Sequence, residues 1–485
     1  MNVTVTLGAT YALIEGSTLK YETRSALLKI LARMLCVYEW NPRIRRMEKG
    51  DQYFTYDPKT KEMRFPIEFY ESISSCAMVG GIKFSRNAIP PNESRRIAFT
   101  SNKGWEPREN QLPPINHLAQ TNGRVGITAQ TGFGKTAITI FSLVKIGDVP
   151  MIVCSGLTDQ WLEALREQTN AGDFIYVIKG YKSIINLMKS DFMPEVFICS
   201  LETLREFAKG EGNYEDIPSY PDFIKHYGIG VKVIDECHLN FKTCVNLDLV
   251  SNVKKNVYLT ATMDRSNRDV KKIFDQVYPA NMRFSAGAYE KYARCICYGY
   301  NGWIMEKKCV TNRGYSHSNF ESQMLKIKGA YDEWTRLVIL PILYQHYVND
   351  PLAKGKKCLL FFRTIDMCNA AMATIKAAHP EKNVVTYVAS DPDSNLDEGD
   401  IIISTHGSAG TGTDIKNLYS VIDTISYKAS NTVKQVFGRL RKLKCGTAPL
   451  YIGMLDLNMV SHERHYAARK TLLIEMAVDF KEYKI

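Results

Sequence analysis

Short apolar segments alternate with helix-like segments over most of the chain after residue 105. Each apolar segment has four or five residues and is followed by a turn or an amphipathic stretch; the segments are 125–129, 151–155, 196–200, 231–234 and 257–260. Strands of a parallel sheet that are buried on both faces have this continuous apolar pattern, and helices connect them. The pattern therefore predicts a parallel sheet flanked by helices.

The same alternation resumes after a polar stretch at 301–319. Its apolar segments are 358–362, 384–389, 400–405, 421–427 and 450–455. A second run of strand and helix patterns predicts a second α/β domain of the same class. We place the two parallel-sheet domains in tandem, at 105–290 and 291–485.

The first 104 residues have a different pattern. A helix-like run at 27–38 is followed by short alternating segments at 52–56 and 63–69. This mixture predicts a small α+β domain at 1–104. The stretch 88–96 contains two adjacent prolines, so it cannot continue a helix and is the expected linker to the rest of the chain.

Composition excludes several classes of protein. Of the 485 residues, 45% are apolar and 23% are charged, and no stretch approaches the roughly 20 apolar residues that a membrane helix needs. The N-terminus lacks the basic and then apolar pattern of a secretory leader, so we expect a cytoplasmic protein with no membrane partner. The twelve cysteines include no C-x-x-C pair, which favours core residues over zinc ligands or disulfides.

The charge of the chain is positive and unevenly distributed. Lys and Arg number 62 against 51 Asp and Glu, a net charge of +11. Residues 1–105 hold 16 Lys or Arg and 10 Asp or Glu, so about a fifth of the chain carries +6 of this excess. A basic balance favours a polyanionic partner such as nucleic acid, with the N-terminal domain as its strongest candidate contact.

A glycine-rich loop joins the first predicted strand of 105–290 to a helix. The segment 124–136 reads RVGITAQTGFGKT, with Ala129 where a strict phosphate-binding loop has its first glycine. Glycines let backbone N–H groups close around phosphates, and the helix N-terminus adds the positive end of its dipole. We expect ATP with Mg²⁺ here, Lys135 on the β and γ phosphates and Thr136 on the metal. The other expected contacts in the loop are Thr131, Gly132, Phe133 and Gly134.

Two adjacent carboxylates follow another predicted strand. Asp235 and Glu236 lie in the sequence VKVIDECH at 231–238, at the carboxyl end of the strand, where parallel sheets bind ligands. We expect Asp235 to hold Mg²⁺ and Glu236 to orient and deprotonate the attacking water, since phosphoryl transfer depends on positioning and charge neutralisation.

With these motifs the chain resembles superfamily 2 helicases of the DExH type over most of 106–485. Gln111, 24 residues before Lys135, is similar to the adenine-reading glutamine of that superfamily. The segment LTAT at 259–262 resembles the motif that links hydrolysis to nucleic-acid movement. The segments CSGLTDQW at 154–161 and CSLET at 199–203 stand where the family has strand-contacting loops.

The second domain has three segments in the family's order. They are LLFFRT at 359–364, STHGSAGTGTDI at 404–415 and QVFGRLRK at 435–442. The resemblance implies that Gly412 and Asp414 contact nucleotide, that Gln435 belongs to the catalytic set and that Arg439 is an arginine finger. The family has a second arginine three residues later on the same helix face, where this chain has Lys442; we favour Arg441 as the second finger, because lysine lacks the bidentate fork.

The N-terminal domain combines basic and aromatic residues on an expected loop and hairpin. Arg43, Arg45 and Arg46 follow Trp40, and this surface could neutralise phosphates and stack on exposed bases. The alternative is an ordinary hairpin with a solvated basic edge. The segment resembles the N-terminal domain of UvsW-type phage branch-migration helicases, which have an Asn-Pro-Arg stretch at a similar place.

The resemblance implies two tandem RecA-like domains and an ATP-dependent DNA helicase or translocase that remodels branched duplex DNA in recombination, repair or replication restart. A phage protein of this kind would act in the host cytoplasm. Two alternatives stay open: an RNA-directed or transcription-associated ATPase on the same core, and a nucleic-acid clamp whose ATP cycle regulates binding without unwinding. The motifs do not separate DNA from RNA, because both polymers follow the same cleft by their backbones.

Overall fold

The computed structural model describes residues 1–41, 45–129, 133–155, 158–209, 218–260, 267–285, 291–312, 314–388, 391–409, 415–443 and 445–485, with the backbone alone at 40, 41, 430 and 431. The chain divides into two compact units, Met1–Gly287 and Ala288–Ile485. Within the described ranges, no helix is both long enough and apolar enough to cross a bilayer.

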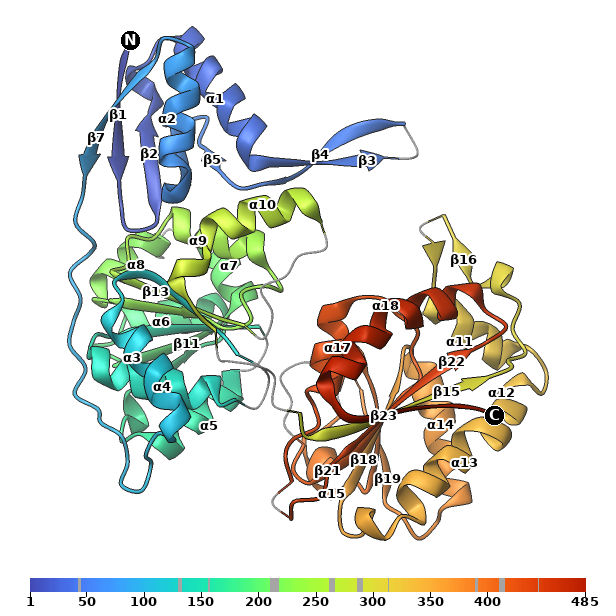
Figure 1. Cartoon of the computed structure of the whole chain (residues 1–485). Helices are drawn as coiled ribbons and strands as arrows, with labels where there is room; N and C mark the ends of the chain where they lie inside the picture. The colour runs from blue at the N-terminus through green and yellow to red at the C-terminus, as the bar shows by residue number, and fades with distance from the viewer. Residues whose placement is uncertain are drawn as a thin grey trace. The chain divides into compact units, whose positions relative to one another are not determined.

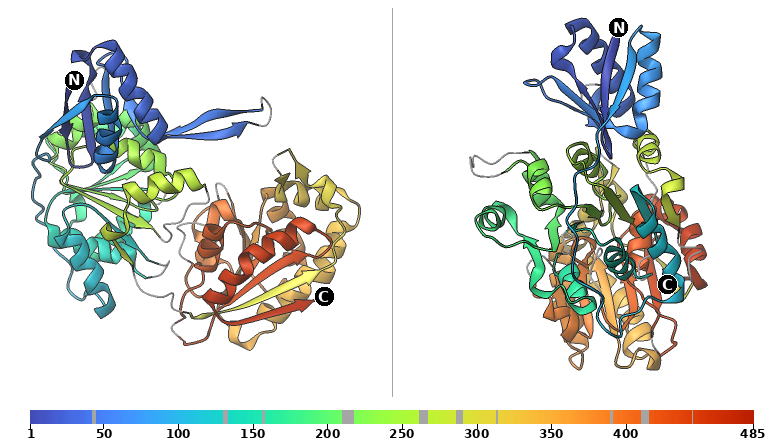
Figure 2. Two further views of the ribbon diagram at one scale, coloured as in Figure 1. Left: turned by 45° about the horizontal axis from the view of Figure 1, so that its top comes forward. Right: turned by 90° about the vertical axis from the view of Figure 1, so that its left-hand side faces the viewer.

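The first unit begins with a five-stranded mixed sheet in the order β5-β6-β2-β1-β7. Strands β1, β2 and β6 pair antiparallel, and β7 joins β1 in parallel. A separate two-stranded hairpin, β3–β4, stands away from this sheet (Figures 1 and 2). The elements are β1 (Asn2–Leu7), β2 (Tyr11–Glu15), η1 (Gly16–Thr18), α1 (Tyr21–Leu35), β3 (Cys36–Asn41), β4 (Arg46–Gln52), β5 (Thr55–Tyr56), β6 (Glu62–Pro66), η2 (Ile67–Phe69), α2 (Tyr70–Val79) and β7 (Lys83–Ala88).

A seven-stranded parallel sheet in the order β10-β11-β9-β12-β13-β8-β14 forms the rest of the first unit. Its elements are η3 (Glu109–Gln111), α3 (Leu112–Gln120), β8 (Gly123–Thr128), α4 (Lys135–Ile146), β9 (Pro150–Cys154), α5 (Thr158–Gln168), η4 (Gly172–Phe174), β10 (Ile175–Ile178), α6 (Gly180–Met188), β11 (Val196–Ser200), α7 (Leu201–Lys209), α8 (Tyr220–His226), β12 (Val231–Ile234), α9 (Phe241–Leu249), β13 (Lys255–Thr260), α10 (Arg268–Val277), η5 (Ala280–Met282) and β14 (Arg283–Ser285).

The two faces of this sheet bury different apolar cores. Helices α3, α4 and α5 cover one face, where Ile152 of β9 is buried. Helices α6 to α10 cover the other face, where the neighbouring Met151 and Val153 are buried, because side chains alternate along a strand. The second core continues into the N-terminal sheet and its helices, so residues of both sheets share one apolar interior. The division at residue 104 remains a proposal.

A buried charged network also joins the two sheets of the first unit. The guanidinium of Arg124, in β8, pairs with Glu68 of the N-terminal part and with Asp248 of α9, and it donates to the carbonyl of Thr10 at 3.0 Å. Lys232, fully buried in β12, donates to the other oxygen of Asp248 at 2.7 Å. Removal of one member of such a network leaves a buried charge without its partner, so the N-terminal sheet is a structural part of this unit.

The second unit contains another seven-stranded sheet, in the order β19-β20-β18-β21-β22-β15-β23, with all neighbouring strands parallel. Its elements are β15 (Ala293–Tyr300), η6 (Glu306–Lys308), β16 (Val310–Thr311), β17 (Gly314–Tyr315), α11 (His317–Lys326), α12 (Ala330–Trp334), η7 (Thr335–Ile339), α13 (Leu340–Leu343), η8 (Tyr344–Val348), η9 (Pro351–Ala353), β18 (Lys357–Phe362), α14 (Ile365–Ala378), β19 (Val384–Tyr387), α15 (Ser394–Glu398), β20 (Ile401–Thr405), α16 (His406–Ala409), β21 (Leu418–Asp423), α17 (Ser430–Phe437), β22 (Leu450–Asp456), α18 (Val460–Met476) and β23 (Ala477–Lys484).

Helices cover both faces of this sheet as well. Leu360 and Phe362 of β18 face a core with α11 to α14, and Leu359 and Phe361 face a core with α15 to α18. The fold is therefore α/β, with two tandem RecA-like parallel-sheet domains and an N-terminal mixed sheet, as predicted from the sequence.

Several sequence predictions are wrong in detail. The helix predicted at 27–38 ends at Leu35, and the next residues form β3, because the β-branched and aromatic residues after Cys36 pair with β4. The strand predicted at 421–427 ends at Asp423. The segment 435–442 is not one helix: α17 ends at Phe437 with Gly438 as its C-cap, so the helix-face spacing of Arg439 and Lys442 does not hold.

Candidate active site

Three neighbouring strands of the first unit bring the phosphate-loop lysine and the paired carboxylates together. Strand β13 lies between β8 and β12, so the loops that follow β8 and β12 leave the same edge of the sheet. At this edge Lys135 Nζ lies 3.6 Å from Glu236 Oε1, and both side chains are largely buried. Residues 101 positions apart in the chain thus form one site.

The phosphate loop ends at a position that only glycine can occupy without strain. Gly134 has φ 93° and caps the N-terminus of α4, and a Cβ on it would lie 2.4 Å from Nε2 of Gln111. Lys135 follows as the first residue of the helix, and its Nζ donates to the carbonyl of Ala129 at 3.2 Å. Lys135 therefore contacts the residue at the other end of the loop. Thr131 and Gly132 lie outside the described residues, while Phe133 and Thr136 are partly exposed.

Gln111 lies against the phosphate loop. Its Nε2 donates to the carbonyl of Phe133 at 3.3 Å, and its Oε1 accepts from the backbone N–H of Arg108 at 3.0 Å. The side chain is 2% exposed, held by η3 and the proline-containing start of α3. Its position beside the loop is compatible with the predicted adenine contact, which stays a prediction.

Asp235 is held by two fixed donors. The indole N–H of Trp161, from α5, donates to Oδ2 at 3.1 Å, and the backbone N–H of Glu236 donates to Oδ1 at 2.9 Å. Burial, and then the neighbouring Glu236 carboxylate, raise the pKa of Asp235 above its usual range, while Lys135 opposes this shift. A bound cation would stabilise the ionised form of a carboxylate under these conditions.

The backbone at Glu236 is strained. Its φ of 48° lies in the left-handed region, which a non-glycine residue adopts at a cost and which is common at functional sites. Nδ1 of the buried His238 lies 3.2 Å from Glu236 Oε2 and 2.7 Å from the hydroxyl of Thr260, at the end of β13. His238 thus connects the carboxylate to the start of the 259–262 segment, whose last two residues lie outside the described ranges.

The oxygen donors at this edge fit magnesium. Asp235 offers a carboxylate and Thr136 a hydroxyl, and Mg²⁺ is bound through one or two such ligands plus substrate phosphates. No group of three or more His, Cys, Asp or Glu that could hold a metal occurs among the described residues. The two oxygen donors leave coordination positions for the phosphate oxygens of a nucleotide.

The second unit has a topological switch point at the carboxyl ends of its central strands. Strands β18 and β21 are neighbours, but the chain leaves β18 through α14 for β19 on one side and leaves β21 through α17 for β22 on the other. Such a switch point opens a ligand crevice in parallel sheets. Arg363 follows β18 there with an exposed side chain, and the hydroxyl of Thr424, beyond β21, donates to the carbonyl of Phe361 at 2.8 Å.

A second buried network holds the start of the segment after β20. Nε2 of His406 lies 3.1 Å from Asp423 Oδ1, and the hydroxyls of Tyr427 and Tyr451 donate to Asp423 Oδ2. The Arg469 guanidinium stacks over the Tyr427 ring, 4.5 Å from its centroid. The side chain of His406 is thus fixed at the edge where Gly412 and Asp414 follow, and these two lie outside the described residues.

The predicted fingers lie beyond the end of α17. Arg439 is 4% exposed in the turn after the helix, and Gln435, still in α17, is partly exposed. The guanidinium of Arg441 donates to the carbonyl of Gly438, and Lys442 is exposed in a segment without regular secondary structure. Their roles remain predictions.

The described part of the β3–β4 hairpin presents two of the three predicted arginines. Arg45 and Arg46 are exposed at the start of β4, and Arg45 has φ 49°, as expected of a residue in a turn. Arg43 and the side chain of Trp40 lie outside the described residues. The stacking of bases on this hairpin remains a prediction.

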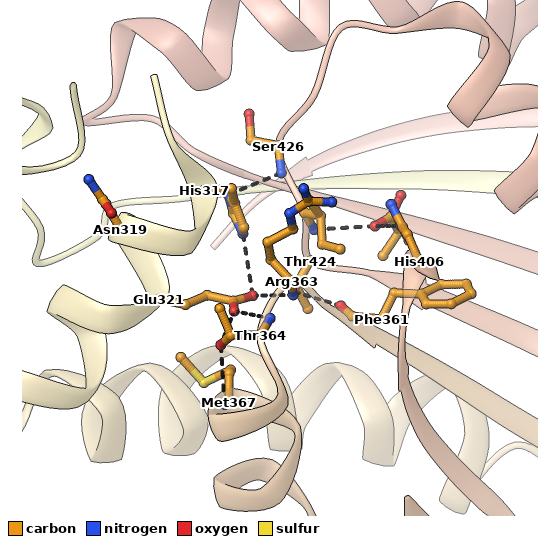
Figure 3. A network of polar contacts seen from close by, with 12 residues as sticks. His317, Asn319, Glu321, Phe361, Arg363, Thr364, Met367, His406, Thr424 and Ser426 are labelled. Atoms are coloured by element: carbon orange, nitrogen blue, oxygen red, sulfur yellow. Dashed lines mark hydrogen bonds and ion pairs between the residues drawn. The ribbon is translucent and has the colours of Figure 1, made fainter. Parts of the chain in front are cut away.

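Three residues with important polar contacts were not predicted from the sequence: Trp161, His238 and Glu321. Trp161 and His238 fall inside segments recognised from the sequence, but their partners come from other strands. Glu321, described below with Figure 3, lies in a stretch with no recognised motif. Only the topology of the sheets brings these side chains to the strand ends.

A search of known protein families finds no match for the chain, and a search of curated proteins finds none. Among solved structures, S. cerevisiae Dbp5 bound to RNA and ADP BeF3 has a TM-score of 0.52 and 13% identity, over 79% of this chain and 91% of that chain. Mss116p bound to ssRNA and AMP-PNP has a TM-score of 0.51 and 12% identity, over 78% of this chain and 74% of that chain. T4 UvsW has a TM-score of 0.36 and 17% identity, over 100% and 99%. The similarity to Dbp5 and Mss116p is one of fold and establishes the tandem RecA-like architecture.

Proposed function

We propose that the chain is an ATP-dependent DNA helicase or translocase that remodels branched duplex DNA, by branch migration or by unwinding forks and junctions. The observation that supports it most is the ion pair of Lys135 and Glu236 beside the buried Asp235, at the edge shared by β8, β13 and β12. A phosphate-binding loop and paired carboxylates at one sheet edge suit hydrolysis of a nucleoside triphosphate.

Each residue of this site has a role in the proposal. Lys135 neutralises the β and γ phosphates, and the Thr136 hydroxyl with Asp235 would hold Mg²⁺, which supplies further charge neutralisation when bound. Glu236 orients the attacking water and takes its proton. When ATP enters, its phosphates replace Glu236 as the partner of Lys135, so the carboxylate becomes available as a base.

Nucleic acid is the proposed partner because exposed arginines lie in both units. The exposed Arg363 lies at the switch point of the second sheet, and Arg45 and Arg46 lie on the hairpin that leaves the N-terminal sheet (Figure 1). Guanidinium groups suit phosphate recognition. We favour branched DNA because the hairpin and the N-terminal sheet extend the first unit beyond its RecA-like core and could contact a second arm of a junction. Roles in recombination, repair or replication restart follow from that substrate.

RNA is the second candidate substrate. Dbp5 and Mss116p, which have a similar fold, are bound to RNA in their solved structures, and the sequence motifs do not separate the two polymers. An ATP-regulated clamp that never unwinds is the third possibility from the sequence.

Strand displacement on matched substrates tests the proposal. Forked duplex DNA, a four-way junction, single-stranded DNA and RNA duplexes of equal length are compared for ATPase stimulation and displacement in one buffer of stated salt, since binding depends steeply on salt. We expect the forked and four-way DNA to give the highest stimulation and to be unwound. Unwinding of RNA alone would assign the second function, and stimulation without displacement on any substrate would assign the clamp.

A further inference from the structure

One buried carboxylate holds the turn at the end of β18. Glu321, from α11, is 1% exposed; its Oε1 accepts from the backbone N–H of Arg363 at 2.6 Å, and its Oε2 accepts from the N–H and the hydroxyl of Thr364 at 2.7 and 2.6 Å (Figure 3). The Thr364 hydroxyl also accepts from the N–H of Met367 and caps α14. Two successive amides and the cap of the next helix are therefore fixed by one side chain.

The buried His317 lies between this carboxylate and the segment that follows β21. The backbone N–H of Ser426 donates to Nδ1 of the buried His317 at 3.3 Å, so the neutral ring carries its proton on Nε2. That nitrogen lies 3.7 Å from Glu321 Oε1. The Tyr315 hydroxyl contacts His317 Nδ1 and His462 Nε2 at 2.8 and 2.6 Å, which fixes the ring from its other side. His317 thus lies between the Glu321 carboxylate and the backbone of Ser426, beyond β21.

Arg363 is the charged residue of the turn formed by residues 363 and 364. Its side chain is exposed and points away from Met367 and α14 in Figure 3. Within the ranges that the structure describes, its guanidinium has no hydrogen bond or ion pair, although Glu321 binds its backbone N–H. Glu321 therefore fixes the backbone of Arg363 and leaves the cation available to a ligand at the switch point.

We propose that Glu321 is a positioning residue that sets the direction of the Arg363 guanidinium toward a phosphate of the bound nucleic-acid strand. The inference rests on the proposed function. An arginine on a free turn loses conformational entropy when it binds, whereas one whose backbone is fixed in advance loses less, so the fixed turn raises affinity without contact between Glu321 and the strand.

A double-mutant cycle on the full chain tests this. Arg363→Ala should weaken binding of a single strand about tenfold and lower the salt slope by about 0.7. Glu321→Gln should cause a loss of similar size in the wild-type background, because the amide group presents a donor to N–H groups that need acceptors. In the Arg363→Ala background, Glu321→Gln should cause no further loss.

The sign of the effect separates positioning from general electrostatics. At pH 8, where Glu321 is largely ionised, Glu321→Gln removes a negative charge, so the field of the protein alone predicts tighter binding of a polyanion, while our proposal predicts weaker binding. Glu306 provides a matched control: its carboxylate accepts from the backbone N–H groups of Val460 and Ser461 and from the Ser461 hydroxyl at the start of α18. Glu306→Gln should lower thermal stability but leave strand affinity and the salt slope unchanged.

Thr364 gives a second pair of variants in case Glu321→Gln does not fold. Thr364→Ser keeps the hydroxyl that Glu321 accepts from and should bind as the wild type does, whereas Thr364→Val should lose affinity only when Arg363 is present. Equal losses in both Arg363 backgrounds, or wild-type affinity of Glu321→Gln and Thr364→Val, would overturn the positioning role. Failure of the wild type to bind any nucleic acid would instead overturn the proposed function and this inference with it.

Discussion

The indole N–H of Trp161 donates to Asp235 Oδ2 at 3.1 Å, across the interior of the first unit. Trp161 lies in α5, after the strand β9, and Asp235 follows β12, the neighbour of β9 in the sheet. A buried tryptophan from the segment at 154–161 therefore orients the carboxylate that we propose for Mg²⁺. Hydrogen-bond partners of metal ligands orient the ligands, so their loss weakens metal binding.

Trp161→Phe should weaken the response to Mg²⁺. Phenylalanine keeps much of the buried ring but lacks the N–H, so Asp235 loses one of its two fixed donors. We expect the Mg²⁺ concentration for half-maximal ATPase to rise about tenfold, and Mn²⁺ binding followed by electron paramagnetic resonance in the presence of an ATP analogue to weaken in parallel. Trp334→Phe, at a buried tryptophan of the second unit, is the control and should change neither value.

Arg439→Ala should lower stimulated ATPase at least tenfold with little change in nucleic-acid affinity, because a finger acts on the charge of the transition state. Arg441→Ala and Lys442→Ala are compared with it to locate a second finger. Because α17 ends at Phe437, helix spacing no longer favours position 442, and we expect Arg441→Ala to have the larger effect. Normal hydrolysis by both single variants would mean that neither residue is a finger.

Replacement of Arg43, Arg45 and Arg46 by Glu should weaken binding to forks and four-way junctions more than to single strands. A patch that neutralises about three phosphates contributes nearly three to the salt slope on duplex DNA. Basal ATPase should be unchanged. Binding is measured over a salt series, and equal losses on both DNA types would indicate a general electrostatic contact without shape recognition.

Lys83→Glu with Arg86→Glu, at exposed positions of β7, is the control for this surface and should have a smaller effect. Deletion of residues 1–100 is not a suitable test. It would remove Glu68 and Thr10 from the buried Arg124 and open the shared core, so a loss of activity would report on the fold of the first unit.

Glu321 should make the stability of the second unit depend on pH. Burial raises the pKa of Glu321 from 4.5 to about 7, against the opposing hydrogen bonds from Arg363 and Thr364. The folded chain therefore holds a proton that the unfolded chain has released between these two values. The contribution to stability is present at low pH and is lost as pH rises through about 7, by about 3 kcal/mol in total.

The measurement compares the wild type with Glu321→Gln at pH 5, 6, 7 and 8. The difference in melting temperature should shift in favour of the variant as pH rises, because only the wild type must ionise a buried group. The ionisable groups around Glu321 are His317, Tyr315, Arg363 and Cys368, and both proteins share them, so their titration cancels in the difference to first order. A difference that is constant with pH would contradict the raised pKa.

The sequence predicts most strands of the two parallel sheets, and most of the strands that it misses are the outermost ones. Central strands are mostly apolar; the segment predicted at 231–234 has Lys232 as its one charged residue, and the structure has β12 at the same residues. Strands β10 and β14 at the edges of the first sheet, and β23 at one edge of the second, were not predicted, because short or polar-faced edge strands lack that pattern. Strand β15, which lies between β22 and β23, was also not predicted. The helix predicted through 442 failed at Gly438, where the chain turns.

The candidate site is predictable only in part for a related reason. Lys135, Asp235 and Glu236 stand in recognisable motifs, and the order of parallel strands is enough to bring them to one edge. Trp161 and Glu321 act through contacts between segments 74 and 42 residues apart, and no local pattern encodes such a contact. Sheet topology alone specifies these pairs.

The most direct test of the account is ATP turnover by the wild type, Lys135→Ala and Glu236→Gln, with and without forked DNA, alongside binding of a fluorescent ATP analogue. We predict that DNA stimulates the wild type, that both variants lose turnover by 10²-fold or more, and that only Lys135→Ala loses nucleotide binding, since Glu236→Gln removes the base and keeps the phosphate site. Lys145→Ala, at a lysine on the same helix that bonds to Asn116, should behave as the wild type does. Turnover by Glu236→Gln above about a tenth of the wild-type rate, or equal nucleotide affinity in all variants, would contradict the assignment of this edge as the site of hydrolysis.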